Sequence, residues 1–410
     1  MNLNKNKLID HIKKIRREIG HSESNINIKN MIYNENTDEL WIITPDRPDK
    51  SSIIGKGGWV VGRLREELKI SKIHVESYSD FILKKYKMEL SLNSLNSLIE
   101  EYKKKQKDYK LPLNNLKILL EEKINNIYNF DFNDYFENSE NIENTENIKT
   151  IKNTENSENT ENIKNTENSE NTETTKNTEN NKNTKTIKNT KNSEPIEKPK
   201  HKAIVALSGG VDSGFSLILA KKLGFNPLAI TIDPGTIILP KQFKNNIKNL
   251  CEELGVEHAY IKVNYEKIVE NALKGKYHPC GRCSTKIEDT LFNYALNNNI
   301  NIVIFGDMLS TGSQCITKQN IIDKNGISKE ITRLNLPATL SVGKEEIKNT
   351  ISKYNIEKIK GFGCPLLYEV HKNYPHMKKF SIQRILRETR AGVLEPGEAL
   401  DLIWAFYKLN

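Results

Sequence analysis

The segment from Ser208 to Ser213 reads Ser-Gly-Gly-Val-Asp-Ser and joins two regular elements. The apolar run from Ala203 to Leu207 predicts a buried strand, and the pattern from Phe215 to Leu223 predicts a helix. Free backbone N–H groups and the positive end of the helix dipole converge at such a junction, where glycines leave the main chain open to a ligand. The segment therefore predicts an anion cradle for phosphate, with a plain glycine turn as the alternative. It fits neither the Walker P-loop pattern nor the GxGxxG pattern of dinucleotide-binding folds.

Three of the five cysteines have a spacing suited to metal or redox chemistry. Cys280 and Cys283 form a CxxC pair, and Cys364 stands alone much later in the chain. The pair is compatible with redox exchange, with half of a zinc site, with part of an iron-sulfur site or with a persulfide relay. Structural zinc prefers four protein ligands, so it would need a further side chain. The candidates for that side chain are His278, His371 and Cys315.

The remaining cysteines are expected to be structural. An odd number of cysteines in a chain of intracellular character argues against a disulfide framework. Cys251 lies in a helical apolar pattern and is expected in the core. Burial is also expected for Cys315, with a late role in sulfur transfer as the alternative.

The elements that position these residues alternate between strand-like and helical patterns after His201. Such alternation predicts an α/β fold with a doubly wound parallel sheet, whose ligands bind at the carboxyl ends of the strands. Asp233, Gly306 and Asp307 fall at those ends, as Ser208 does. The predicted strands are Ala203–Leu207, Pro227–Ile232, His258–Val263 and Asn301–Phe305, and the predicted helices are Gly214–Leu223, Lys241–Leu254 and Ser284–Asn297.

Length and charge bound the class of protein. A chain of 410 residues is long enough for two or more folded units. The formal net charge is +9, with basic ends and an acidic middle segment over residues 131–200. This distribution favours a polyanionic partner such as RNA, although solvated lysine faces give the same balance. Neither an apolar stretch long enough for a membrane span nor a signal-peptide core is visible, so we expect a cytoplasmic protein without membrane partners.

The first 90 residues contain a glycine turn between two predicted helices. The expected order is helix, two strands, helix, the turn from Gly55 to Gly58, helix and strand. This order and the GxxG turn resemble a KH domain, which implies that Gly55, Lys56, Gly57 and Gly58 lie against a single-stranded RNA backbone, with Arg63 on the following helix. A glycine turn without a ligand is the alternative.

The rest of the chain divides by composition. Residues 91–136 predict a helical spacer without chemistry. Residues 137–200 consist almost entirely of Asn, Thr, Glu, Lys and Ser, so they cannot bury enough apolar surface to order and predict a disordered linker. We assign residues 201–370 to the catalytic domain and residues 371–410 to C-terminal basic helices. There Arg384, Arg387 and Arg390 share one helix face, a suitable track for RNA phosphates or else a solvated face.

The hexamer from Ser208 to Ser213 resembles the SGGxDS signature of the PP-loop ATP pyrophosphatases. This resemblance implies that ATP and Mg²⁺ bind at the hexamer, and that Asp233 at the end of the second strand contributes to the adenosine pocket. The family's histidine and paired carboxylate after the fourth strand are missing. Asp307 there holds magnesium or caps a helix. The residues implied in ATP binding are Ser208, Gly209, Gly210, Asp212, Ser213, Asp233, Gly306 and Asp307, with Asp212 and Ser213 as catalytic groups.

The hexamer together with the cysteines resembles the tRNA thiolases of the two-thiocytidine and two-thiouridine synthetase family. The stretch Lys344-Glu345-Glu346-Ile347 is similar to a helix start of that family. The resemblance implies that Cys280, Cys283 and Cys364 hold a 4Fe-4S cluster, with zinc as the alternative. The zinc-finger pairs of two-thiouridine synthetases are missing, and the KH-like region occupies their place.

The expected function is therefore ATP-dependent tRNA thiolation. A base oxygen of tRNA, or of another structured RNA, is adenylated with release of pyrophosphate, and sulfide from the cluster replaces AMP. The sulfur donor is a protein or free sulfide, and a homodimer is left open. The alternatives are a PP-loop enzyme that transfers sulfur or nitrogen to a small metabolite, and a non-catalytic RNA-binding protein with a nucleotide-binding fold.

Overall fold

The computed structural model describes residues 4–407 except 23, 36–37, 129, 138–200, 323–325 and 358–361. Residues 1–132 and 200–410 form one compact unit, and residues 133–199 form the other. The linker predicted over residues 137–200 lies outside the described residues from 138 onward. The account below concerns the first unit.

The N-terminal part of this unit has its own small sheet and core. The element order is the predicted one, and in the sheet β1 and β2 are antiparallel while β2 and β3 are parallel. Apolar side chains from the helices and strands form one buried cluster, which includes Ile12, Leu40 and Val60. The assignment to the KH family stays a prediction. The elements are α1 (Lys5–Glu18), β1 (Asn30–Asn34), β2 (Glu39–Thr44), α2 (Arg47–Ile54), the short helix η1 (Lys56–Gly58), α3 (Trp59–Leu68) and β3 (Lys72–Ser77).

Two long helices follow, α4 (Tyr78–Lys104) and α5 (Lys110–Asn125). The sequence predicted two helices where α4 is continuous, because a short polar stretch after Leu90 interrupts the apolar pattern. That stretch contains neither glycine nor proline, so nothing in it breaks the helix. Both helices are bound to the α/β part: Tyr102 Oη lies 2.7 Å from Thr332 Oγ1, and Tyr109 Oη donates to the carbonyl of Lys202.

The central sheet has six strands in the order β6-β5-β4-β7-β9-β8. Five are parallel, and only the edge strand β8 runs antiparallel to its neighbour β9. The predicted α/β class is confirmed. The β8–β9 hairpin was not predicted, because its exposed first strand carries mostly polar residues. The strands are β4 (Lys202–Ala206), β5 (Asn226–Asp233), β6 (Glu257–Lys262), β7 (Ile302–Phe305), β8 (Ile316–Ile322) and β9 (Ser328–Asn335).

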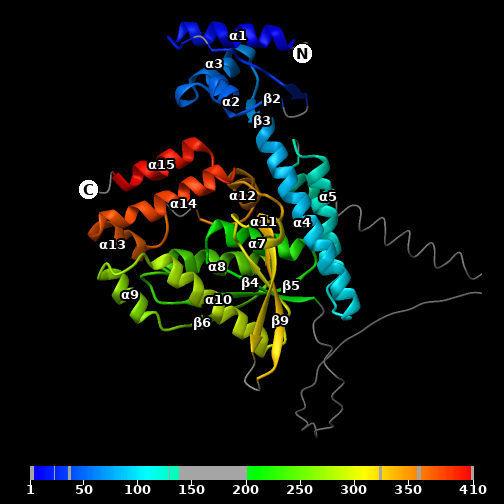
Figure 1. Cartoon of the computed structure of the whole chain (residues 1–410), viewed down its shortest axis with the longest axis vertical. Coiled ribbons are helices and arrows are strands. Elements are labelled where there is room, and N and C mark those ends of the chain that lie inside the picture. Colours follow the sequence, from blue (N-terminus) through cyan, green and yellow to red (C-terminus); the bar gives the residue numbers. More distant parts are fainter. Residues whose placement is uncertain are drawn as a thin grey trace, which may run out of the picture. The chain divides into compact units, whose positions relative to one another are not determined.

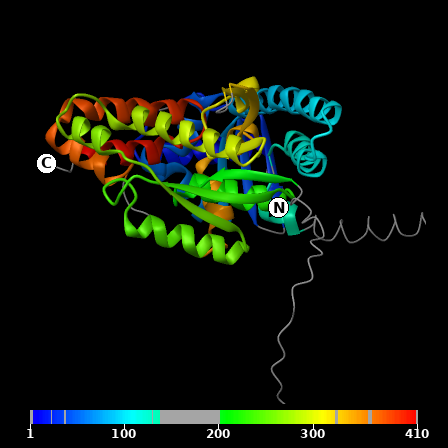
Figure 2. The same ribbon diagram turned by 90° about the horizontal axis from the view of Figure 1, so that it is seen from below.

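Helices cover both faces of this sheet (Figure 1). Side chains of α10 such as Leu291 and Phe292 share a buried cluster with Ile204, Ile230 and Val303 of the strands. Helix α8 lies on the opposite face of the sheet from α10 (Figure 2). The helices are α7 (Val211–Lys222), α8 (Lys241–Leu254), α9 (Glu266–Leu273), α10 (Pro279–Asn297), α11 (Leu336–Thr339), α12 (Lys344–Ile351), α13 (Pro365–Asn373), α14 (Lys378–Arg390) and α15 (Pro396–Tyr407), with the short helices η2 (Gly312–Cys315) and η3 (Pro375–Met377).

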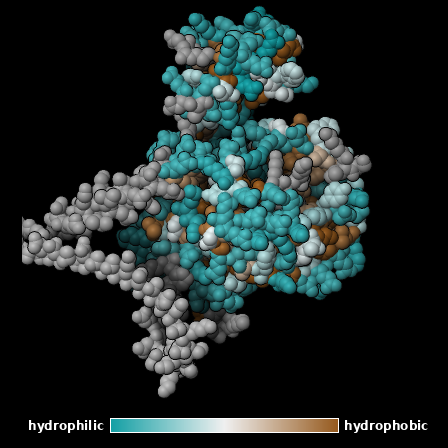
Figure 3. Space-filling model, turned by 180° about the vertical axis from the view of Figure 1, so that it is seen from behind, coloured by the Kyte–Doolittle hydropathy of each residue, from teal (hydrophilic) through white to brown (hydrophobic). Residues whose placement is uncertain are grey.

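The surface is mainly polar. Hydrophilic residues predominate on the face drawn in Figure 3, and the hydrophobic patches there are small and scattered. Within the described ranges, none of the helices has the length and apolarity needed to cross a lipid bilayer.

The contact between α4 and β9 yields a stability test. Replacing Tyr102 by Phe leaves the buried hydroxyl of Thr332 without this hydrogen bond. We expect a loss of about 1–2 kcal/mol in the free energy of unfolding, measured by urea denaturation. Tyr86→Phe is the control, because Tyr86 lies on the same helix and is exposed. Equal stability of the two variants would contradict the role of this contact.

Candidate functional site

The hexamer forms a closed loop between β4 and α7. The Ser213 hydroxyl accepts a hydrogen bond from the backbone N–H of Ser208 and donates one to the carbonyl of Gly210, at 3.1 and 3.0 Å. It also lies 3.0 Å from the Ser208 hydroxyl. Ser213 is buried, so its side chain fixes the curvature of the loop. Its predicted catalytic role is untested, and the geometry indicates a positioning role.

Two glycines allow other backbone segments to approach this loop closely. A Cβ atom on Gly209 would lie 2.5 Å from the carbonyl oxygen of Phe243 in α8, and Gly209 also has a positive φ of 77°. A Cβ atom on Gly306, which follows β7, would lie 2.9 Å from the backbone nitrogen of Ser213. Contacts this short do not tolerate a side chain, so both positions require glycine. The ends of β4 and β7 thereby meet at the N-terminus of α7.

The carboxylate of Asp212 in the hexamer is paired with a lysine. Lys344 Nζ lies 2.5 and 2.6 Å from its two oxygens, and both side chains are largely shielded from solvent. Lys344 is the first residue of α12, so this helix places a cation at the phosphate loop. An ammonium group at this position neutralises Asp212 and can also attract phosphate oxygens.

The start of α12 is fixed by a second ion pair. Glu346 accepts a hydrogen bond from the backbone N–H of Gly343, which caps the helix, and pairs with Lys123 of α5. Burial alone would raise the pKa of Glu346, but the Lys123 ammonium outweighs it, so the pKa lies below its ordinary value. Helix α5 therefore helps to position Lys344, a role that the prediction of a spacer without chemistry missed.

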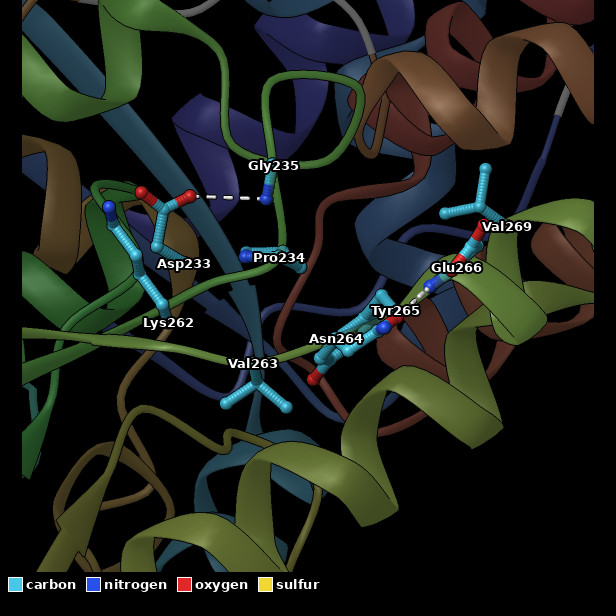
Figure 4. A pocket seen from close by; sticks show the side chains of 9 residues that line it. All are labelled: Asp233, Pro234, Gly235, Lys262, Val263, Asn264, Tyr265, Glu266 and Val269. Carbon is cyan, nitrogen blue, oxygen red and sulfur yellow. Dashed lines mark hydrogen bonds between the residues drawn. The ribbon is translucent and has the colours of Figure 1, made fainter.

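A cavity of about 570 Å³ lies at the carboxyl ends of β5 and β6 (Figure 4). Asp233 borders it and accepts a hydrogen bond from the backbone N–H of Gly235, while Lys244 pairs with its other oxygen at 2.6 Å. Burial alone would raise the pKa of Asp233, but Lys244 and Gly235 hold it below its ordinary value. The residue is thus an ionised carboxylate beside an open cavity, which suits the predicted adenosine pocket.

The carboxylate of Asp307 bonds to the turn that follows it. Its two carboxylate oxygens accept hydrogen bonds from the backbone N–H of Leu309 and from the hydroxyl of Ser310. These bonds stabilise the turn after β7. Of the two roles predicted for Asp307, the geometry favours the structural one over magnesium binding.

The three candidate ligand cysteines lie at helix N-termini. Cys280 and Cys283 are in the first turns of α10, which begins at Pro279 and not after the CxxC pair as the sequence analysis expected. Proline is favoured at the first helical position, which explains the earlier start. Cys364 is the N-cap residue of α13. All three thiols are free and partly buried.

These three thiols lie within electrostatic reach of one another. Burial raises the pKa of Cys280 to about 11 and that of Cys283 to about 12, and Cys364 contributes to both increases. Among the described residues, however, the structure contains no set of three His, Cys, Asp or Glu side chains close enough to hold a single metal ion. The thiols are thus neighbours without forming a tight single-ion site.

Arg384 of α14 connects the cysteines to the phosphate loop. Burial alone would lower the pKa of Arg384, but Glu388 outweighs it and raises the pKa, with smaller contributions from Cys280 and Asp212. Arg384 is therefore near a candidate ligand and near the loop at the same time. Arg384, one member of the predicted phosphate track, thus links the cysteine site with the phosphate loop.

The other two cysteines lie in the core, as expected. Cys251 and Cys315 are buried. Cys315 contacts the hydroxyl of Ser91 on α4 and the carbonyl of Ser310. Both contacts involve the Cys315 sulfur, and neither is made with Cys280, Cys283 or Cys364.

The residues predicted to bind RNA in the N-terminal part are distributed around the glycine turn. Gly55, Gly57 and Gly58 all have positive φ, and Lys56 is exposed. Arg63 instead pairs with Glu18 and Glu67, so its guanidinium already has partners. RNA binding by this turn stays a prediction.

Lys344 is a residue of the site for which the sequence predicted no catalytic or binding role. The available signal was its place in the stretch Lys344-Glu345-Glu346-Ile347, which is similar to a helix start of the thiolase family. His278 and His371 were considered only as zinc ligands, but the hydroxyl of Ser381 lies between them, at 3.3 and 3.2 Å from their Nε2 atoms. Burial lowers the pKa of His371 to about 4 and also lowers that of His278. Both imidazoles are therefore neutral at pH 7.

The pair of Lys344 and Asp212 generates a binding test. In Lys344→Met the carboxylate loses its counter-ion and faces incoming phosphates as an uncompensated negative charge. We expect the Kd for ATP to rise about tenfold, measured by isothermal titration calorimetry. Lys348→Met is the matched control, because Lys348 lies one turn along α12 and pairs with Glu398 instead. Unchanged ATP affinity in Lys344→Met would remove Lys344 from the site.

Comparisons with known proteins agree with this geometry. The family model described as queuosine biosynthesis protein QueC matches residues 202–317, from β4 to the start of β8. The uncharacterized protein MJ1638 of Methanocaldococcus jannaschii is 36% identical over 206 residues, which are 50% of this chain and 74% of that protein. The tRNA-specific 2-thiouridylase MnmA of Persephonella marina is 28% identical over 130 residues, which are 27% of this chain and 35% of that enzyme.

Among solved structures, the U34-tRNA thiolase NcsA from Methanococcus maripaludis with its 4Fe-4S cluster aligns at 16% identity with a TM-score of 0.30. The alignment covers 53% of this chain and 74% of that chain, and a score this low carries no argument. This chain spans about a third of the length of the thiouridylase, so that enzyme's activity is not transferred here. The phosphate loop, the sheet and the match to MJ1638 lead to one conclusion: the chain belongs to the family of MJ1638, within the PP-loop ATP pyrophosphatase superfamily.

Proposed function

We propose that this protein is a cytoplasmic ATP-dependent tRNA sulfurtransferase. The observation that carries the proposal is the proximity of three groups that are far apart in the sequence: the phosphate loop, the three thiols and Arg384. The three thiols lie within electrostatic reach of one another, and Arg384 lies within reach of both Cys280 and Asp212 of the phosphate loop. Nucleotide activation and sulfur chemistry therefore have adjacent sites, which a thiolation reaction requires.

The first step uses the phosphate loop. A base oxygen of the RNA attacks the α-phosphorus of ATP, and pyrophosphate leaves with the oxygen that bridged the α- and β-phosphorus atoms. The start of α7 and the backbone N–H of Gly209 would stabilise the charge that grows on the departing phosphates, and the N–H of Gly210 would join them by releasing the Ser208 hydroxyl. Lys344 adds a cation there, and ATP enters as its magnesium complex. In the second step sulfide attacks the activated ring carbon, and AMP departs with the former base oxygen.

The cysteines fit an iron-sulfur cluster better than a single zinc ion. A cluster distributes its thiolate ligands over several iron atoms, so its cysteines lie farther apart than those around one ion. Cys280, Cys283 and Cys364 are free, and their electrostatic coupling places them near one another, which is compatible with ligands shared among several iron atoms. Cys280, Cys283 and Cys364 would hold the cluster, which when bound supplies sulfide at an iron without a protein ligand.

Neutral histidines support this choice of ligands. His278 and His371 interact with Ser381 through their Nε2 atoms, and a metal-bound imidazole would have to give up one of these contacts. Soft thiolates are the preferred ligands of iron-sulfur clusters, and three of them are present without recruiting a histidine.

A second function has one observation in its favour. The QueC family model matches residues 202–317, which contain the phosphate loop and the CxxC pair but not Cys364. A PP-loop enzyme acting on a small metabolite is therefore the runner-up. RNA-independent release of pyrophosphate, unchanged after removal of residues 1–76, would favour it. The cut belongs before α4, because α4 and α5 pack on the α/β sheet.

Anaerobic purification tests the cluster directly. We expect about four iron atoms and four sulfide ions per chain, together with a broad absorbance band in the visible region, as for a 4Fe-4S centre. Zinc without iron would contradict the cluster and leave the ATP site unaffected.

Substitution of the third ligand tests sulfur transfer. We expect Cys364→Ala to abolish thiolation of tRNA transcripts, measured by their retardation in an organomercury gel, while ATP affinity stays unchanged. Cys251→Ala is the matched control, because Cys251 is a buried cysteine outside the site. Full thiolation by Cys364→Ala would exclude this residue from the reaction.

A further inference from the structure

A second cavity, of about 440 Å³, lies beside the cysteines. Its volume is within the range of small-molecule sites, about 300–1,000 Å³. Cys280 at the start of α10 forms part of the wall, and Phe362 precedes Cys364 by two residues. The opposite wall comes from one face of α14. The residues used in the argument are Cys280, Phe362, Phe380, Arg384, Arg387 and Arg390.

The arginines give this cavity a positive rim. Arg384 pairs with Glu388 at 3.0 Å. Within the described part of the chain, the guanidinium groups of Arg387 and Arg390 make no hydrogen bond or ion pair, so both are available to an anion. Guanidinium groups bind phosphate through paired hydrogen bonds. Two unpaired arginines at one mouth therefore suit a ligand with phosphate groups.

Aromatic rings line the same cavity. Phe380 is 42% exposed, although a large apolar side chain gains nothing from contact with water. The imidazole of His278 lies 5.5 Å from the Phe380 ring, and Arg384 lies 5.7 Å from the ring of Phe362. Flat surfaces of this kind stack on unpaired nucleobases. The neutral His278 can offer or accept a hydrogen bond at a base edge without adding charge.

The proposed reaction needs both ATP and an acceptor base, and the two cavities suit different members of this pair. The cavity of Figure 4 adjoins Asp233 at the end of β5, the strand next to β4, and suits the adenosine of ATP. Sulfur transfer also requires the acceptor base to reach the site of the sulfur. Only the cavity on α14, of these two, has a candidate sulfur-site cysteine in its wall.

From these observations we infer that the cavity on α14 binds the target nucleotide of the RNA, turned out of its stack, with the base against Phe380 and flanking phosphates at Arg387 and Arg390. The inference rests on the proposed function and adds its substrate class, a nucleotide in a single-stranded loop. A base held in a paired helix cannot enter a cavity of this size, since it must first be unstacked.

Photo-crosslinking tests the site without requiring activity. The probe is a tRNA transcript made in vitro with 4-thiouridine in place of uridine, bound to the full-length protein under anaerobic conditions. We expect a crosslinked peptide from α14, and the yield should fall at least fivefold in Phe380→Ala. Leu386→Ala is the matched control, because Leu386 has the same 42% exposure on the same helix but does not line the cavity.

Kinetics separate substrate binding from chemistry. In Phe380→Ala the KM for tRNA should rise about tenfold, the usual effect of losing one base–aromatic stack, while the Kd for ATP and the iron content stay unchanged. Phe380→Tyr keeps the ring and should restore the KM of the wild type. The double variant Arg387→Ala/Arg390→Ala should raise the KM and weaken its dependence on salt.

The outcomes distinguish this inference from the proposed function. Thiolation by the wild type with no crosslink in α14 and an unchanged KM in both sets of variants would overturn the nucleotide site alone. A crosslink in α14 that Phe380→Ala removes, without thiolation, would uphold the nucleotide site and overturn sulfur transfer. Absence of both RNA crosslinking and thiolation would overturn both.

Discussion

The site depends on a close approach of backbone segments at the carboxyl edge of the sheet. The order β5-β4-β7 means that the chain leaves β4 toward one side of the sheet and later returns on the other. Such a switch point opens a crevice at the strand ends, where ligands bind in α/β folds. Because Gly209 and Gly306 have no side chain, α8 and the end of β7 can pack directly against the start of α7. A side chain at either glycine would force these segments apart.

Charge is placed around this crevice by helices that begin there. Lys344, at the first position of α12, neutralises Asp212 in the phosphate loop. The position of α12 depends in turn on the pair of Glu346 with Lys123, which comes from α5. A buried ion pair contributes little net stability but fixes geometry when both partners are matched. Helices α4 and α5, which precede the long segment outside the described residues, thus help to build the candidate site.

The thiols and the cavity on α14 extend the same edge. Cys280 and Cys283 occupy the start of α10, and Cys364 caps α13. Because burial favours the protonated thiol, these cysteines become effective ligands only when a metal centre takes the place of their protons. The charge of Arg384 interacts both with the Cys280 thiol and with the Asp212 carboxylate. ATP at the loop and an acceptor base on α14 would therefore be neighbours.

The sequence by itself determined the features that depend on short segments. The turn from Ser208 to Ser213, the four parallel strands β4 to β7, and the element order around Gly55 follow from local periodicity and glycine positions, because backbone preference acts over a few residues. The proline before Cys280 also signalled a helix start, although the sequence analysis placed that start later. Only the tertiary structure decided which distant residues meet.

Lys344 and Asp212 are separated by 132 positions, and Lys123 and Glu346 by 223. The same holds for Cys364 and the CxxC pair, for the packing of α4 on the sheet, and for the polar hairpin of β8 and β9. Such pairings result from the burial of whole helix faces and from the order of the strands. The packing energy that favours them is spread over many residues, so no single sequence position indicates which partner it will meet.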